Sequence, residues 1–175
     1  MVGDQGPDFV ALLPALLRYA RSLTRDPLAA EDLVHDALVS ALNHLASFDV
    51  NRSMRPWLFG IIHNQFISDV CREAVRQDYL GQLKHPSAAS PVQDRREELR
   101  RVDLALAELP VPQREALHLV AVEALTYQQA ADALGVPVGT VMSRVSRARR
   151  CLRQAQEQQE QPPAALRLVG KGQDR

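Results

Sequence analysis

Residues 126–152 decide the fold of this chain, and they read TYQQAADALGVPVGTVMSRVSRARRCL. Thr126 followed by Gln129 fits a capping box, which predicts the start of a helix. Gly135 is placed to end that helix in a left-handed turn. Pro137 then predicts the start of a second helix, because proline is favoured at the first helical position.

The second of these helices has an apolar side and a basic side. Its apolar residues are spaced as one buried helical stripe, and they are Val141, Val145, Ala148 and Leu152. The remaining face carries Gly139, Thr140, Met142, Ser143, Ser146, Arg147 and Arg150, with Arg144 and Arg149 on its flanks. Two short helices joined by a tight glycine turn, the second rich in arginine, are typical of a DNA-binding helix-turn-helix. A plain helical hairpin with a solvated basic face would show the same pattern.

Charge is distributed unevenly along the chain, although the formal net charge is zero. Residues 26–50 contain no Lys or Arg, and their acids are Asp26, Glu31, Asp32, Asp36 and Asp49. Residues 138–153 contain no acid, and their arginines are Arg144, Arg147, Arg149, Arg150 and Arg153. This asymmetry predicts one surface for a basic partner and another for phosphates. Two solvated helix faces would also explain it, so charge alone decides little.

Upstream of this region, apolar residues at helical spacing predict three further helices. The first carries Leu13, Leu16, Leu17 and Ala20. Asp26 is a plausible N-cap, with Pro27 at the first helical position, for a second helix that runs to about residue 46. Its expected apolar stripe consists of Leu38, Leu42 and Leu45. After a loop at 48–55, a third helix carries Trp57, Ile61, Ile62, Phe66 and Val70.

The fold class that follows is all-α, with two small helical domains joined by a flexible linker. We expect the first domain at residues 8–78 and the linker at 79–97, where Gly, Pro, Ser and Ala replace apolar periodicity. The second domain is expected at 98–154, and a disordered Gln-rich tail at 155–175.

Other classes of protein are disfavoured by the sequence. Cys71 and Cys151 lie too far apart for a zinc ribbon or disulfide framework, and the histidines lack metal-ligand spacing, so we expect no metal. The sequence has no phosphate-cradling glycine loop or catalytic serine elbow, and no carboxylate sits in an obvious apolar pocket. We therefore expect no catalytic residues, no cofactor and no enzyme activity. Neither a secretory signal nor a membrane span is evident, which favours a cytoplasmic location.

Two separate parts of the chain resemble one family. Residues 109–117, 126–131, 136–144 and 146–149 are similar to the promoter-reading domain 4 of extracytoplasmic-function sigma factors, which belong to the sigma-70 superfamily. Residues 30–37, which read AEDLVHDA, resemble domain 2 of the same family, as do 47–48 and 55–64. The two matches occur in the family's order and cover roughly residues 9–153.

The resemblance implies a sigma factor that binds core RNA polymerase and directs promoter-specific transcription initiation. It implies that the β′ coiled coil of polymerase is bound by an acidic helix with Glu31, Asp32, Leu33, Val34 and Asp36. Contacts to the minus-10 element are implied for Asp49, Asn51, Arg52, Ser53, Met54, Trp57 and Asn64. Contacts to the minus-35 element are implied for Gly139, Thr140, Met142, Ser143, Arg144, Ser146, Arg147 and Arg149.

Some of these assignments have plain structural alternatives. Trp57 could be a core residue and Asn64 a solvent-facing amide. The chain also departs from the family, which often has Gln in place of His35 and Lys or Arg in place of Met142. The second departure removes a candidate DNA contact, so promoter preference cannot be transferred from the family.

The resemblance also implies regulation by an anti-sigma protein, in a stress or envelope response. Two rival functions remain open from the sequence. One is a stand-alone repressor, which would need a dimerisation element or ligand pocket. The other is a sigma mimic that binds an anti-sigma protein without reading DNA, although the Arg-rich helix argues against it.

Overall fold

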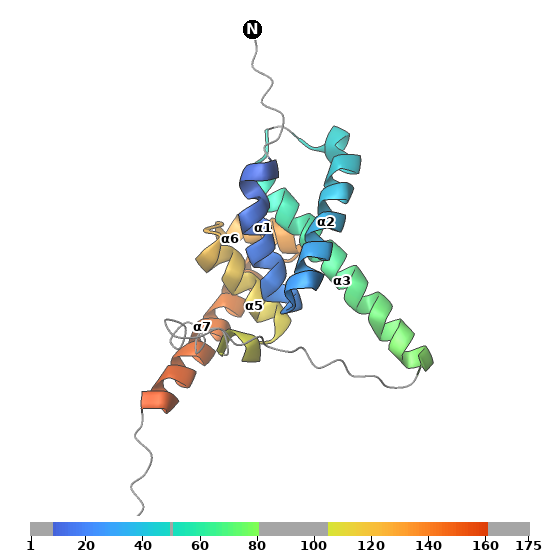
Figure 1. The fold of residues 1–175 in the computed structure, drawn as a ribbon. Helices are drawn as coiled ribbons and strands as arrows, with labels where there is room; N and C mark the ends of the chain where they lie inside the picture. The colour runs from blue at the N-terminus through green and yellow to red at the C-terminus, as the bar shows by residue number, and fades with distance from the viewer. Residues whose placement is uncertain (1–8, 50, 81–104, 161–175) are drawn as a thin grey trace, which may run out of the picture.

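A computed structural model describes residues 9–49, 51–80 and 105–160, and every regular element in these ranges is helical. We call residues 9–80 the N-terminal half and residues 105–160 the C-terminal half. The N-terminal half contains α1 (Phe9–Thr24), α2 (Pro27–His44), the short η1 (Leu45–Ser47) and α3 (Met54–Leu80). The C-terminal half contains α5 (Val111–Leu117), the π-helical η2 (His118–Val122), α6 (Tyr127–Leu134) and α7 (Val138–Glu160). Figure 1 shows α3 and α7 extending from a common body as two long rods.

The start of α2 is built as the sequence predicts. The Asp26 carboxylate accepts hydrogen bonds from the backbone N–H groups of Leu28 and Ala29, at 2.8 and 3.1 Å. Pro27 occupies the first helical position, where its missing N–H is not needed. The helix therefore begins at the predicted residue.

The predicted apolar stripe of α2 is wrong. Leu42 is 58% exposed and Leu38 and Leu45 are only half-buried. The buried residues are instead Ala30, Leu33, Val34, Ala37 and Ala41. This helix packs against both α1 and α3. Alanines on the inner face allow that close approach, so the larger leucines lie on the outer side.

The helix-turn-helix is confirmed in the C-terminal half. Thr126 and Gln129 form both hydrogen bonds of the capping box at the start of α6. Gly135 ends α6 with a φ of 61°, a left-handed conformation that glycine adopts without steric cost. On α7, Val141, Val145 and Ala148 are buried and Leu152 is packed against the core, which matches the predicted stripe.

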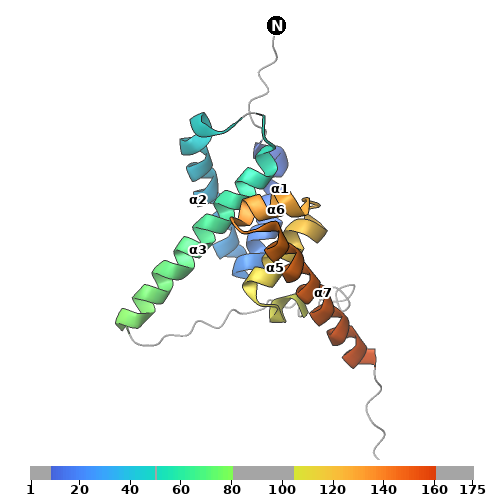
Figure 2. The same ribbon diagram turned by 180° about the vertical axis from the view of Figure 1, so that it is seen from behind.

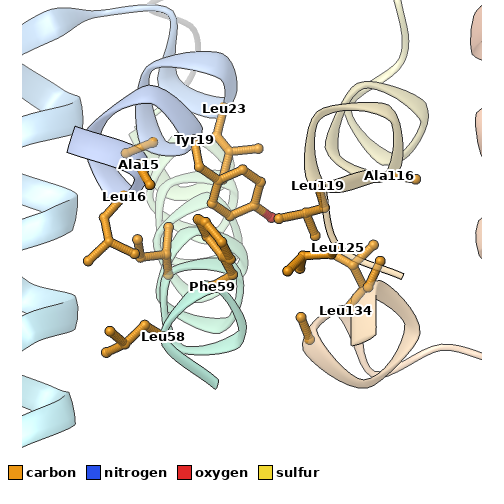
Figure 3. Packing of buried hydrophobic residues seen from close by; sticks show 14 of the residues in the cluster. Ala15, Leu16, Tyr19, Leu23, Leu58, Phe59, Ala116, Leu119, Leu125 and Leu134 are labelled. Atoms are coloured by element: carbon orange, nitrogen blue, oxygen red, sulfur yellow. The ribbon is translucent and has the colours of Figure 1, made fainter. Parts of the chain in front are cut away.

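The two halves pack against each other and share one buried apolar cluster. In Figure 3, Tyr19 of α1 and Phe59 of α3 face Leu119, Leu125 and Leu134 of the C-terminal half. The rings of Tyr19 and Phe59 meet edge to face, with centroids 5.2 Å apart. Figure 2 shows α6 lying across α3.

Gly60 of α3 lies close to the backbone of α6. A Cβ atom built at this residue would lie 3.1 Å from the backbone oxygen of Ala133. Even the methyl group of alanine at this position would require the Ala133 backbone to shift by a few tenths of an ångström. A glycine in the middle of a helix costs up to about 1 kcal/mol relative to alanine, which the close packing of the two halves offsets.

The helix ends differ from the predicted domain boundaries. Residues 79 and 80, predicted as the start of the linker, belong to α3, and 81–97 lie outside the described residues. The predicted tail begins too early, because α7 continues to Glu160. Gln, Glu and Ala are good helix formers, so the Gln-rich composition of 154–160 is compatible with a helix. The rest of the predicted tail, 161–175, also lies outside the described residues.

Candidate functional site

The acidic face of α2 points into solvent. Glu31, Asp32 and Asp36 are all exposed, as expected for residues that bind a partner. Glu31 forms a weak surface ion pair with Arg21 at 3.7 Å. Asp32 and Asp36 form no ion pair within the described residues, so their charges are available to a basic partner.

The same face borders a groove with a volume of about 370 Å³. Its floor contains Leu33, Phe66 and Val70, and carboxylates lie along it from two helices: Asp32 and Asp36 from α2, and Asp69 and Glu73 from α3. The last two are paired with arginines one turn further along α3, Asp69 with Arg72 and Glu73 with Arg76. The α2 acids therefore supply most of the uncompensated charge.

Two residues predicted to bind polymerase do not lie on this surface as expected. Leu33 and Val34 are only 4% and 3% exposed, because they belong to the inner face of α2. Leu33 still reaches the groove floor, whereas Val34 lies in the core. The apolar side of the groove also includes Phe66 and Val70, which the sequence predicts only as part of a helix stripe.

The loop before α3 brings together the residues predicted for the minus-10 element. Asp49 accepts hydrogen bonds from the backbone N–H and the side-chain amide of Asn51, both at 3.0 Å. These hydrogen bonds hold the pKa of Asp49 below its usual value, with a further contribution from the charge of Arg52. Asn51, Arg52 and Ser53 are exposed, so this loop presents polar groups in a defined conformation.

Trp57 and Asn64 occupy different environments on α3. Trp57 is half-buried, and the centre of its ring lies 4.7 Å from that of Phe48. This ring contact links the start of the loop to α3. Met54 is packed against the same core. Asn64 is exposed and lies seven positions after Trp57, on the same side of the helix. Trp57 thus packs against Phe48 while part of its side chain stays exposed, and Asn64 is exposed on the same helix.

The basic face of α7 is exposed from its first turn onward. Gly139, Met142, Ser146, Arg147 and Arg149 are exposed, and Met142 retains 53% of its accessible area. Thr140, Ser143 and Arg144 are half-buried. The hydroxyl of Ser143 donates to the backbone oxygen of Thr140 at 2.9 Å, so it is already engaged within the helix.

Arg147 lies on the side of α7 opposite the buried stripe, and Arg150 lies one turn beyond it. Both side chains can reach a phosphate or a guanine edge from that side. The sequence predicts Arg150 on this face, although the minus-35 contacts implied by the family resemblance do not include it. Its exposure and position make it an equal candidate.

Two carboxylates are buried although the sequence shows no carboxylate in an obvious apolar pocket. Glu115 and Glu123 belong to the C-terminal half and are 1% and 0% exposed. Both lie in the mostly apolar run EALHLVAVEAL at 115–125. A charged residue within such an apolar run is the sequence signal that could have predicted their burial.

Glu123 is held by cations from the N-terminal half. Arg18 of α1 donates to both carboxylate oxygens at 3.2 Å, and Arg55 of α3 donates to one of them at 2.5 Å. Burial alone would raise the pKa of Glu123, but the hydrogen bonds from these two arginines bring it below its usual value. His118 contributes a third contact at 3.3 Å, and burial lowers the pKa of this imidazole.

Glu115 makes a second set of contacts between the halves. His63 of α3 lies 2.8 Å from its carboxylate, and the Tyr19 hydroxyl donates to the same oxygen at 3.5 Å. Burial, followed by the nearby charge of Glu115, raises the pKa of Tyr19 well above its usual value. Both buried carboxylates therefore have ion-pair or hydrogen-bond partners from the N-terminal half.

No helix in the described ranges is long and apolar enough to cross a membrane. Within the same ranges, no group of His, Cys, Asp or Glu side chains is arranged to hold a metal ion.

Comparisons with known proteins match both halves. The family model for sigma-70 region 2 matches residues 9–76, and that for sigma-70 region 4 matches residues 99–152. The extracytoplasmic-function (ECF) RNA polymerase sigma factor EcfG of Rhodopseudomonas palustris (strain TIE-1) is 38% identical over 143 residues, which cover 81% of this chain and 79% of that protein.

Two solved structures are similar over most of the chain. One is the sigma factor RpoE in complex with the anti-sigma factor NepR from Bartonella quintana, with a TM-score of 0.76, 35% identity and coverage of 86% of this chain and 94% of that chain. The other is CnrH in complex with the cytosolic domain of CnrY, with a TM-score of 0.62, 30% identity and coverage of 85% and 84%.

Proposed function

The chain belongs to the extracytoplasmic-function family of sigma-70 RNA polymerase sigma factors, and from this we propose which of its surfaces bind core polymerase, promoter DNA and a regulatory partner. A member of this family is a transcription initiation factor and not an enzyme. It binds core RNA polymerase and directs promoter-specific initiation.

The acidic face of α2 and its groove are the proposed polymerase-binding surface. The supporting observation is that Asp32 and Asp36 project their charges beside an apolar floor. A basic coiled coil such as that of β′ suits this surface, because charge steers the encounter and apolar burial holds the complex. Asp69 and Glu73 of α3 extend the surface beyond the residues expected from the sequence.

Promoter DNA is assigned to two further surfaces. The loop from Asp49 to Met54, with Asn64, would bind the minus-10 element, where an exposed amide can recognise an unstacked base. The outer face of α7, around Arg147, would enter the major groove at the minus-35 element. We assign the minus-10 surface to the N-terminal half, residues 9–80, and the minus-35 surface to the C-terminal half, residues 105–160.

The regulatory partner proposed for this chain is an anti-sigma protein. The similarity to the sigma factor RpoE, which was solved with the anti-sigma factor NepR, supports this assignment. Such control fits a stress or envelope response. The proposed location is the cytoplasm, which is the compartment of bacterial RNA polymerase.

Transcription with purified components tests the function. Purified chain is mixed with core polymerase and a library of promoter fragments, and the transcripts are sequenced. We expect initiation from a subset of fragments that share minus-10 and minus-35 motifs. If the chain ignores core polymerase but represses a promoter by itself, the repressor alternative replaces the sigma function.

A further inference from the structure

The first turns of α7 carry two exposed apolar side chains, which we call the apolar pair of α7. Val138 is 39% exposed and Met142 is 53% exposed, and they lie one helical turn apart on the same side of the helix. The buried stripe of this helix lies at Val141 and Val145, which are 0% and 1% exposed. The core of the protein therefore leaves more than half of the Met142 side chain open to solvent.

The surroundings of Met142 point to DNA as the molecule that covers it. Single exposed apolar side chains are common on protein surfaces and need no explanation. Residues 138–153, however, contain five arginines and no acid, so this part of α7 attracts phosphates. In a helix-turn-helix, the N-terminal residues of the second helix contact base edges in the major groove. Met142 lies in that part of α7, five positions before Arg147, so a base edge would cover its exposed surface.

Gly139 leaves room for a base edge beside Met142. A Cβ atom built at Gly139 would meet no other atom within 4 Å, so packing among the described residues does not require glycine there. Glycine is also less favourable in a helix than alanine. A glycine is useful, however, where another molecule must approach the backbone closely. The surface beside Met142 is therefore open to an approach from outside the chain.

The side chains at this end of α7 favour an apolar contact over a hydrogen bond. The hydroxyl of Ser143 donates to the backbone oxygen of Thr140, so its proton is not available to a base. Methionine has no hydrogen-bond donor, and its thioether is only a weak acceptor. Met142 therefore cannot donate to the acceptor groups of guanine or adenine. The group that it can contact favourably is an apolar one.

Thymine offers such a group, because its 5-methyl lies at the major-groove edge of the base pair. Apolar contact with this methyl is one way in which proteins read sequence directly, and the flexible methionine side chain can adapt to its position. We propose that Met142 is a specificity-determining residue that recognises the 5-methyl group of a thymine in the minus-35 element. Val138 and Gly139 form the rest of the contact surface. The inference rests on the sigma function proposed above, and it names one base that the same DNA surface reads.

Replacement of thymine by deoxyuridine tests this contact, because it removes the methyl group and keeps every hydrogen-bonding group of the base pair. The DNA is the promoter fragment that initiates most strongly in the library experiment, with each thymine of its minus-35 element replaced separately on either strand. Binding of the full-length chain with core polymerase is measured on each fragment, beside initiation. Burial of one methyl group corresponds to about a fourfold change in affinity, so wild type should bind one deoxyuridine fragment about fourfold less tightly.

Three variants separate the methyl contact from a general effect on folding. Met142→Ala removes the apolar side chain and should bind the thymine and deoxyuridine fragments equally, which completes a double-mutant cycle across the interface. Met142→Leu keeps an apolar side chain of similar size and should retain most of the preference. Val75→Ala is the matched control, because Val75 is 60% exposed on α3, and it should retain the full preference. All three changes are at exposed helix positions, so the urea midpoint should stay close to that of wild type.

Several results would overturn the assignment of Met142. One is a Met142→Ala variant that still prefers thymine over deoxyuridine as strongly as wild type does. Others are wild type that binds every fragment with equal affinity, and a minus-35 element that contains no A·T pair. In each of these cases initiation would still occur, so the sigma function would stand. Failure of wild type to initiate from any fragment would instead overturn the sigma function, and this inference with it.

Discussion

Reversing one charge on α2 should weaken polymerase binding without disturbing the fold. Asp36 is exposed, lines the groove beside Asp32, and forms no ion pair within the described residues. Substitution of Asp36 by Arg places a good helix former at an exposed helix position, so the free energy of unfolding should change by only about ±0.5 kcal/mol. Any loss of binding can then be assigned to the surface itself.

The size of the loss follows from the change in charge. Two unit charges 4 Å apart in water interact by about 1 kcal/mol. Asp36→Arg changes the charge by two units, so against one partner cation at that distance the binding free energy falls by about 2 kcal/mol, roughly a 30-fold loss of affinity. The Debye length, beyond which salt screens charges from each other, falls from about 10 Å at 0.1 M salt to about 3 Å at 1 M. The loss of affinity should therefore become smaller as the salt concentration rises.

The assay is binding of full-length chain to core polymerase, measured by fluorescence anisotropy across a salt series, beside promoter-dependent transcription. Glu157→Arg is the matched control, because it makes the same charge change on exposed α7. Wild-type affinity for Asp36→Arg would show that α2 is not the polymerase contact. A loss that is equally large at every salt concentration would show that the effect is steric, and would refute the electrostatic reasoning.

Three other changes test separate parts of the structure. Arg147→Ala should cost about 1–3 kcal/mol of promoter binding and relax the preference at one minus-35 position; footprints on promoter variants with an unchanged preference would remove Arg147 from the site. Thr126→Ala removes the side chain that accepts from the Gln129 backbone N–H at 3.1 Å, and should lower the free energy of unfolding by about 1 kcal/mol; an unchanged urea midpoint would contradict this. Burial keeps the pKa of His118 below its usual 6.5. The stability that depends on the neutral ring is therefore lost as the pH falls through this lowered pKa. The pKa of Glu123 also lies below its usual 4.5, so this carboxylate adds a second loss of stability at still lower pH. A urea midpoint that stays constant between about pH 7.5 and pH 5, where histidine ordinarily titrates, would refute the role of His118.

Local chemistry explains which parts of the fold were predictable. The caps at Asp26 and Thr126 and the turn at Gly135 depend on residues within a few positions of each other, and all three are confirmed. The buried stripe of α7 also follows from spacing alone. On α2 the predicted buried stripe is wrong, because it assumes that the leucines face the core. The helix packs closely against two other helices, and the small residues Ala37 and Ala41 lie on its buried face instead.

The contacts between the halves could not be predicted in this way. Glu123 binds partners 105 and 68 positions away, and Glu115 binds His63 from 52 positions away. Helical spacing relates only residues a few positions apart, so it cannot predict these pairs. The predicted arrangement, two domains on a flexible linker, also gives no reason to expect a buried interface between them. The sequence does not predict Asp69 and Glu73 as groove residues for a related reason. They line the same groove as Asp36 only because α3 packs beside α2.

The division of charge between the two halves, with Arg18, Arg55 and His63 on one side and Glu115 and Glu123 on the other, has a consequence for how such factors can be recombined. A chimera that joined this N-terminal half to a foreign C-terminal half lacking acids at the positions of Glu115 and Glu123 would bring Arg18 and Arg55 against an apolar surface. The reverse chimera would enclose two carboxylates with no counterion, at a cost of several kcal/mol for each. The two halves are therefore a matched pair and not interchangeable modules, and a cell with many factors of this kind could diversify them only by changing both sides of the contact together.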